Sequence, residues 1–295
     1  MRFRAVAVLT AIALPCLADQ RTQRLLERLA EEASAFEQNA PNLISEETLR
    51  QRAQKLQKKR FHPRIETGAP PPGPEWQNRE IRSEYAFASV GDPPAIREIR
   101  KVLTVDGNTV NTSERAVQDL VRTLRASDDK SRKKLLEDFE KHGLIGTVTD
   151  FGQILLLFAR RNQEAYEFAE RGERLLGAER CAIFAYRQHD GPGALTIWDS
   201  KGRIQPQADG EIWVDRESFR VVRITIKSAR GLGPDAVRDE AQVDYAMSSH
   251  GVVVPVSVEH REYRAGQLTA ENLFTYAPFR KFGASADIKF SEVGP

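Results

Sequence analysis

The stretch GEIWVDRESFRVVRITIKS, residues 210–228, decides the fold of this 295-residue chain. Ile212 and Val214 alternate with polar neighbours, and after a polar turn Ile224 continues the same apolar set while Arg223 takes the opposite parity. Alternation with a period of two is typical of a strand that is buried on one face. Two such runs joined by a short polar turn predict an antiparallel hairpin with one apolar and one polar face.

The same alternation continues through most of the chain after residue 76. Short turns join the successive runs and favour an antiparallel meander, because a parallel sheet needs helical crossovers for which there is no room. A wide sheet with one apolar face curls, pairs with a second sheet or is covered by helices. We therefore predict an α+β fold with a large antiparallel sheet of about eleven strands and helices available as its cover. Besides two strands within residues 76–110, the predicted strands span residues 166–171, 180–188, 194–199, 210–215, 220–228, 236–247, 252–264, 267–276 and 287–292.

The N-terminus has the pattern of an export signal. Two arginines precede an apolar run that Pro15 breaks, and Ala18 ends a small-residue motif of the kind that a signal peptidase reads. The run is too short for a membrane anchor, which needs about 20 apolar residues. Pro15 also makes a poor lipoprotein signal around Cys16. We expect residues 1–18 to be a signal peptide, cleaved before Asp19, and the mature chain to reach the periplasm or the extracellular space, as in a Gram-negative-type bacterium.

Helix-like patterns come before the sheet. Leu25, Leu29 and Phe36 fall at helical spacing, and Ser45 is a good N-cap for a second helix. The sequence GAPPPGP then suits a stiff extended spacer, because proline-rich backbone joins neither a helix nor a central strand. The expected organisation is an N-terminal helical segment at residues 19–67, a proline-rich linker at residues 68–75 and a main domain at residues 76–295.

Two helices are predicted within the main domain. The first spans about residues 113–141. The second, TDFGQILLLFARR at residues 149–161, contains the apolar run ILLLF, which is also compatible with a buried strand because periodicity does not decide for so short a run.

Charge and cysteine content exclude several classes of protein. The chain has 44 basic and 42 acidic residues, so removal of Arg2 and Arg4 with the signal leaves 42 of each. A neutral mature protein has no global field that would attract nucleic acid or an anionic membrane. The chain contains two cysteines, and cleavage would leave only Cys181, so no intramolecular disulfide is expected. Cys181 alternates with Ile183 and is interpreted as a packed strand residue rather than a catalytic thiol, for which no nearby base is visible.

The sequence contains no complete catalytic motif. Ser127 and Lys130 match the S-x-x-K pattern, but the partner motifs of that enzyme class are missing from the sequence. The glycines at 231 and 233 lie between two predicted strands and form a turn. No two of the five histidines have metal-ligand spacing, so neither a metal nor another cofactor is predicted. His260 follows the apolar parity of Val258 and is interpreted as a satisfied strand-end histidine rather than a base.

Three segments resemble a known family: GEIWVDRESFRVVRI (210–224), VVVPVSVEHREY (252–263) and ENLFTYAPFRKFGASADIKF (271–290). The chain is similar there to the periplasmic lipoprotein-carrier superfamily, which includes LolA-like and LppX-like carriers and the sensor domain of RseB-like regulators. The resemblance covers roughly residues 76–293 and rests on the strand pattern. It implies an eleven-stranded half-barrel whose concave apolar face is partly plugged by helices and accepts acyl chains.

Three functions follow as hypotheses. The first is a non-enzymatic carrier or sensor of a lipid or acyl ligand, and the second is an envelope protein-interaction module of the same fold. The third is a hydrolase with an unrecognised site. A fold alone does not choose between them. For the first hypothesis, the residues expected to line the concave apolar face are Ile212, Val214, Val222, Ile224, Val243, Tyr245, Val256 and Val258.

Overall fold

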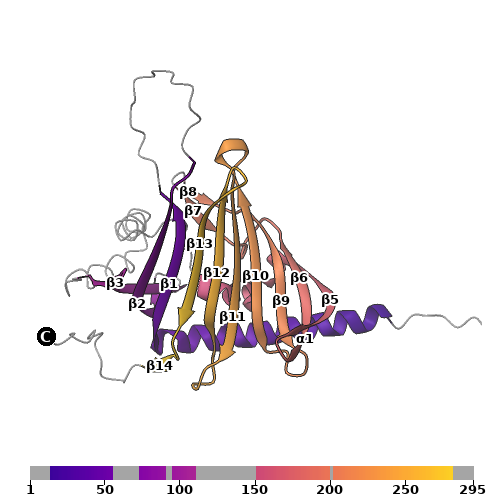
Figure 1. The fold of residues 1–295 in the computed structure, drawn as a ribbon. Helices are drawn as coiled ribbons and strands as arrows, with labels where there is room; N and C mark the ends of the chain where they lie inside the picture. The colour runs from indigo at the N-terminus through magenta and orange to yellow at the C-terminus, as the bar shows by residue number, and fades with distance from the viewer. Residues whose placement is uncertain (1–13, 56–72, 91–94, 111–150, 200–201, 282–295) are drawn as a thin grey trace, which may run out of the picture.

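The computed structural model describes residues 14–55, 73–90, 95–110, 151–199 and 202–281. In these ranges one large antiparallel sheet dominates, as predicted, and its strands lie side by side in Figure 1. The sheet is open, because its end strands, β4 and β5, do not pair with each other. The strand order is β4-β3-β2-β1-β13-β12-β11-β10-β9-β6-β5, with β14 also paired to β1 and a separate two-stranded sheet formed by β7 and β8.

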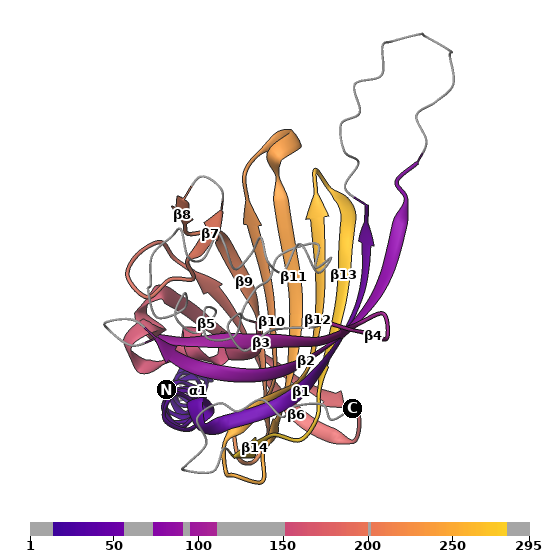
Figure 2. The same cartoon turned by 90° about the vertical axis from the view of Figure 1, so that its left-hand side faces the viewer.

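The strand bounds agree with the predicted meander over most of the described chain. The strands are β1 (Leu43–Gln54), β2 (Trp76–Val90), β3 (Ala95–Val105), β4 (Asn108–Thr109), β5 (Tyr166–Leu176), β6 (Glu179–Gln188), β7 (Ile197–Asp199), β8 (Gly202–Ile204), β9 (Gln207–Asp215), β10 (Val221–Arg230), β11 (Val237–Met247), β12 (Val253–Arg264), β13 (Gln267–Tyr276) and β14 (Arg280–Lys281). Figure 2 shows the curvature expected of a half-barrel: β2 and β3 run across the direction of β9 to β12.

The prediction of a helix beginning at Ser45 is wrong, because these residues form strand β1. This strand pairs with β2 on one side and β13 on the other, so the first strand of the chain lies inside the sheet. Its burial alternates regularly, but several of its buried side chains are polar: Ser45, Glu47 and Gln51. A polar inner face hides the period-two signal, and the segment's Glu, Arg, Gln and Leu residues have high helix propensity, which the pairing overrides.

The helices lie on one side of the sheet. The N-terminal helix α1 (Leu14–Asn39) runs across the strands along one end of the sheet (Figure 1), and the 3-10 helix η1 (Ala40–Asn42) joins it to β1. The predicted helix at residues 149–161 is present as two 3-10 helices, η2 (Phe151–Phe158) and η3 (Arg160–Ala165), and a further 3-10 turn is η4 (Gly233–Asp235). The predicted helix at 113–141, the strand at 287–292 and most of the linker at 68–75 lie outside the described residues.

One hydrophobic cluster joins the helices to the sheet. The predicted stripe of α1 is buried at Leu25, Leu29 and Phe36, and η2 adds Leu155 and Phe158 to the same cluster. We call the side of the sheet that carries this cluster the inner face and the opposite side the outer face. Because α1 begins at Leu14, the helix passes through the predicted cleavage point before Asp19, while the α1 residues of this cluster lie after it. Cleavage itself stays a prediction.

Candidate ligand-binding face

The side chains that the sequence assigns to the concave apolar face fall into two groups. Six of the eight belong to the buried cluster of the inner face: Ile212, Val214, Ile224, Val243, Tyr245 and Val258. They come from β9, β10, β11 and β12, which are consecutive neighbours in the sheet. The structure therefore brings them together on one continuous apolar surface, and their contact with a ligand stays a prediction.

Val222 and Val256 do not belong to this surface, because each lies at a β-bulge. In β10 the register shifts between Val221 and Arg223, and Val221 takes the place in the core cluster that was expected for Val222. In β12 a similar shift leaves Val256 38% exposed. A bulge inserts one extra residue and thereby reverses the parity of the strand. The prediction that Val256 points to the concave side is therefore wrong. Val222 is buried but lies outside the cluster, and its place on the ligand-binding face stays a prediction.

A helical cover closes the inner face. Helix η2 is fixed to the sheet by Tyr245, whose hydroxyl donates to the carbonyl oxygen of Gly152 (3.2 Å) and accepts from the amide of Leu155 (3.3 Å). Eight residues is long for a 3-10 helix, whose hydrogen bonds have poorer geometry than those of an α-helix. Besides these two hydrogen bonds, buried apolar side chains of η2, among them Leu155 and Phe158, hold it against the sheet.

The turn of the 210–228 hairpin holds the other part of the cover, α1. Arg24 donates a hydrogen bond from Nη2 to the carbonyl oxygen of Glu217 (2.8 Å), and its guanidinium stacks 4.3 Å from the ring centroid of Phe219. Phe219 is buried and adopts a left-handed backbone conformation with φ of 58°, which is uncommon for a residue with a side chain. The hairpin therefore has a supporting role: its turn fixes α1 over the inner face.

A buried carboxylate adds a second link between α1 and this hairpin. Glu32 is only 4% exposed, accepts a hydrogen bond from the amide of Val221 beside the bulge (3.2 Å), and lies 3.0 Å from Nε of Arg28. Desolvation raises the pKa of Glu32 to about 7, although the Val221 amide and the Arg28 charge act in the opposite direction. The contact is therefore sensitive to pH near neutrality.

A buried ion cluster on the inner face was not predicted from the sequence. Arg100 of β3 contacts Glu47 of β1 (Nε to Oε1, 2.8 Å) and Glu98 of its own strand (Nη2 to Oε2, 2.6 Å), and all three residues are at most 7% exposed. Burial alone would lower the pKa of Arg100, but the two carboxylates hold it well above its ordinary value. The signal was hidden because Glu47 lies in the segment that was expected to be helical.

His260 is held in a directional hydrogen-bond chain, which confirms its interpretation as a satisfied histidine. Gln51 donates to Oδ1 of Asn272 (2.9 Å), so the Asn272 amide nitrogen faces Nδ1 of His260 (3.1 Å) as a donor. Nε2 of His260 is then left to donate to Asp239 (3.1 Å). Although burial would raise the pKa of Asp239, His260 and Arg230 together lower it below its ordinary value.

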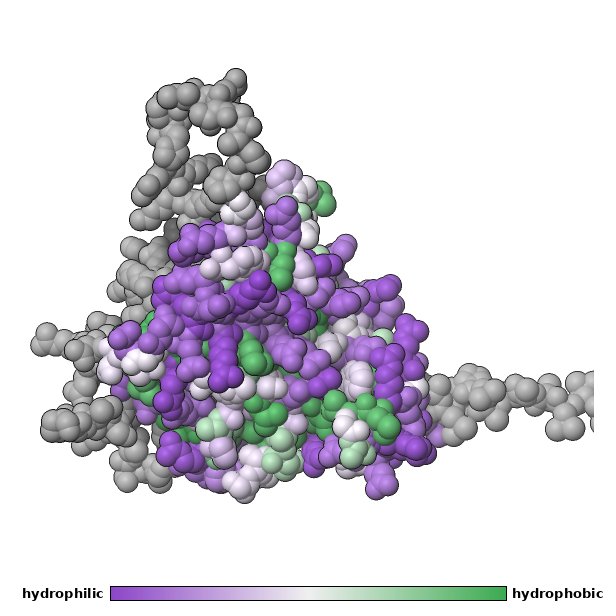
Figure 3. Space-filling view, viewed as in Figure 1, coloured by the Kyte–Doolittle hydropathy of each residue, from purple (hydrophilic) through white to green (hydrophobic). Residues whose placement is uncertain are grey.

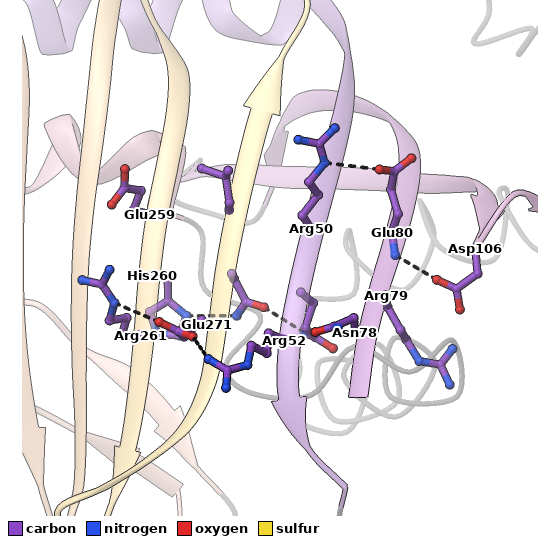
Figure 4. Close-up of a pocket in the computed structure, with 13 residues that line it drawn as sticks. Arg50, Arg52, Asn78, Arg79, Glu80, Asp106, Glu259, His260, Arg261 and Glu271 are labelled. Atoms are coloured by element: carbon purple, nitrogen blue, oxygen red, sulfur yellow. Dashed lines mark hydrogen bonds and ion pairs between the residues drawn. The ribbon is translucent and has the colours of Figure 1, made fainter. Parts of the chain in front are cut away.

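The outer face carries a shallow hollow of about 600 Å³ across β2, β1, β13 and β12 (Figure 4). Five of its charged side chains are paired with one another: Arg50 contacts Glu80 (3.3 Å), and Glu271 contacts both Arg52 (2.9 Å) and Arg261 (3.3 Å). Guanidinium groups neutralised in this way offer little to an anionic ligand. We therefore assign this hollow to the solvated side of the sheet.

Charges alternate along a whole row of the outer face. The cross-strand partners in this row form an unbroken series from β5 to β1: Glu167, Arg187, Asp209, Lys227, Glu240, Arg261, Glu271 and Arg52. Opposite charges directly across from each other favour this pairing over a slipped one. Figure 3 shows that hydrophilic residues cover most of this side of the molecule.

The described residues show neither a metal-binding cluster nor an activated thiol. That part of the chain holds no group of three or more His, Cys, Asp or Glu side chains placed to bind a metal ion. Cys181 is buried, and desolvation raises the pKa of its thiol, which is the opposite of what an activated nucleophile needs. In the described ranges no helix combines the length and the apolar character that crossing a membrane requires.

Comparison with known proteins finds similarity in structure alone. Neither a protein-family model nor a curated protein matches the sequence. Among solved structures, a DUF1329 family protein from Desulfovibrio piger is similar with a TM-score of 0.33 and 10% identity, over 90% of this chain and 95% of that one. A LolA superfamily protein from Nitrosomonas europaea is similar with a TM-score of 0.31 and 11% identity, over 92% of this chain and 97% of that one.

Proposed function

We propose that this chain is an exported, non-enzymatic protein that binds a lipid or acyl chain on the inner face of its half-barrel, as a carrier or sensor. One observation carries the proposal. The apolar surface of β9 to β12 is continuous, and among the described residues its cover consists of the separate helices α1 and η2. Each buried methylene contributes about 0.8 kcal/mol, so a long acyl chain binds such a surface without any specific polar contact.

A ligand reaches this surface by displacing part of the cover. The inner-face side chains are buried against α1 and η2, so the ligand and the cover compete for the same apolar area. Helix η2 is the part that leaves, because it is short and lies directly on the sheet at Tyr245, in the middle of the apolar surface that the ligand takes. The competition makes a clear prediction: a weaker cover gives a tighter complex.

The test is a titration of the full mature chain with a neutral, environment-sensitive fluorescent acyl probe. Leu155→Ala removes a fully buried side chain from η2, which loosens the cover but leaves the sheet residues intact. We expect this variant to have a lower melting temperature and yet a several-fold higher affinity for the probe. Mass analysis of apolar molecules that copurify with the wild-type protein then identifies the natural class of ligand.

A matched control separates this effect from general destabilisation. Leu273→Ala removes the same atoms from an outer-face position that is 36% exposed, and it leaves probe affinity unchanged if binding occurs on the inner face. If Leu155→Ala only lowers the melting temperature and no variant binds the probe, the inner face is an ordinary core. A stable protein complex in a pull-down without lipid would then favour the interaction-module hypothesis.

A further inference from the structure

Tyr85 of β2 is a fully buried tyrosine whose hydroxyl has no hydrogen-bond partner among the described residues. Its ring is held firmly, with ring centroids 4.7 Å from Tyr276 and 5.1 Å from Phe87, and the Arg100 guanidinium lies 5.0 Å from its ring centroid. Buried polar groups are almost always paired, because leaving one unpaired costs about 1–3 kcal/mol. A donor kept in this state at a fixed position therefore calls for a functional reason.

The hydroxyl points at the start of the movable helix η2. A Cβ atom added to Gly152 would lie 2.6 Å from the Tyr85 hydroxyl, so this glycine backbone fills the space directly in front of it. The carbonyl oxygen of the same glycine accepts a hydrogen bond from the Tyr245 hydroxyl on β11 (3.2 Å). One peptide group of the cover thus lies against two tyrosine hydroxyls from separate parts of the sheet.

We propose that Tyr85 and Tyr245 form the binding site for a neutral carbonyl group, an ester or amide, at the head of the acyl ligand. This inference rests on the proposed function, because the site opens only when η2 leaves the sheet. The ligand carbonyl enters the space that Gly152 vacates. Its oxygen lies closer to Tyr85 than the Gly152 carbonyl oxygen does, so that it accepts a hydrogen bond from Tyr245 and gives the Tyr85 hydroxyl the partner that it lacks. The inner-face cluster beside the two tyrosines takes the chain.

The surrounding charges favour a neutral head over a carboxylate. Glu98 and Glu47 are buried on the same face and raise the pKa of Tyr85 beyond the effect of its burial, whereas Arg100 lowers it. Two carboxylates and one guanidinium leave a net negative charge beside the hydroxyl. An anionic head placed at the Tyr85 hydroxyl would be repelled by these carboxylates in a region of low dielectric. The peptide carbonyl of Gly152 already accepts from Tyr245, so a neutral acceptor fits at that half of the site.

The test compares three competitors of equal chain length against the fluorescent probe: methyl dodecanoate, dodecanoate and dodecane. For the wild-type protein we expect the ester to compete best. Tyr85→Phe should lower the ratio of ester affinity to dodecane affinity roughly fivefold, which corresponds to the loss of one ordinary hydrogen bond. The same variant should keep or raise the melting temperature, because it deletes a buried hydroxyl that has no partner.

Tyr276→Phe is the matched control, because it removes the hydroxyl of the neighbouring tyrosine. After burial, the Glu47 carboxylate is the largest cause of the raised pKa of this hydroxyl, so the two groups interact. Loss of the hydroxyl should lower the melting temperature while the preference for the ester remains. Opposite results for the two tyrosines would support the assignment of Tyr85 to ligand binding.

Two results would overturn the proposal while the proposed function stands. One is a probe-binding Tyr85→Phe variant with an unchanged preference for the ester. The other is a loss of stability in Tyr85→Phe, which would show that its hydroxyl is a structural partner of Glu98. If neither the wild-type protein nor any variant binds the probe, the proposed function fails and the carbonyl site fails with it.

Discussion

Gly210 shows how one residue limits the packing of the 210–228 hairpin. A Cβ atom at this position would lie 2.0 Å from the carbonyl oxygen of Thr225, a distance that cannot exist without backbone movement. The Tyr186 hydroxyl donates to the same carbonyl oxygen (2.8 Å). We expect Gly210→Ala to lower the free energy of unfolding by about 3 kcal/mol, measured by urea denaturation. Gly73→Ala, with nothing within 4 Å of the added atom, is the control and should be neutral.

Glu32 gives a pH dependence whose sign follows from its environment. Its pKa rises from 4.5 to about 7 in the folded protein, so the fold prefers the protonated acid. The associated stability is fully present below pH 4.5 and is lost as the pH rises through 7, with a loss of roughly 3 kcal/mol. Glu32→Gln removes this titration. Urea denaturation should therefore show that the free energy of unfolding of the variant increases relative to that of the wild-type protein as the pH rises from 5 to 8.

A neighbouring acid provides the control for that measurement. Glu31 lies next to Glu32 on the same helix, but its side chain is 65% exposed, so Glu31→Gln should leave the pH profile of unfolding unchanged. An equal profile for Glu32→Gln and the wild-type protein would show that the Glu32 carboxylate is solvated and does not hold α1 to the sheet.

At the scale of elements, strand positions could be predicted wherever the inner face is apolar. Strands β9 to β13 alternate apolar and polar residues, and the sequence alone locates them well. Strand β1 alternates just as regularly in burial, but its inner side chains include Glu47 and Gln51. The partners of these two residues, Arg100 and Asn272, lie far away along the chain. The bulges at Val222 and Val256 were equally hidden, because an extra residue in one strand is defined only against its partner.

The charge row of the outer face permits a test of register at this scale. Arg261 lies between Glu240 of β11 and Glu271 of β13, so Arg261→Glu places three acids side by side. We expect a loss of about 1–2 kcal/mol in the free energy of unfolding, reduced in 1 M NaCl because these side chains are at least partly exposed. Arg261→Gln removes attraction without adding repulsion and should cost clearly less. A loss that salt does not change would point to packing instead.

For the whole molecule, the sequence predicts a one-faced sheet with a helical cover, and the structure has that architecture. The polar part of the inner face escaped prediction. Arg100 and Glu47, like Asn272 and Gln51, lie far apart in the chain, and their hydrogen bonds exist only after β1 has entered between β2 and β13. Contacts between polar residues on different strands leave no repeating pattern in the sequence of any one strand. The candidate site was therefore predictable in its apolar half and hidden in its polar half.

The cover provides the test at the scale of the molecule. The buried residues of α1 in the core cluster begin at Leu25, so a chain that starts at Asp19 should unfold at the same temperature as the full chain. A chain that starts at Ala40 loses Leu25, Leu29 and Phe36 from the cluster. Each of these side chains contributes roughly 1.5–3 kcal/mol, and their sum approaches the whole stability of a typical domain. We expect the shorter chain to aggregate or to bind a hydrophobic dye strongly when it is purified. If it instead unfolds cooperatively near the wild-type melting temperature without binding dye, η2 alone closes the inner face, and the contacts of Arg24 and Glu32 with the hairpin do not hold the cover.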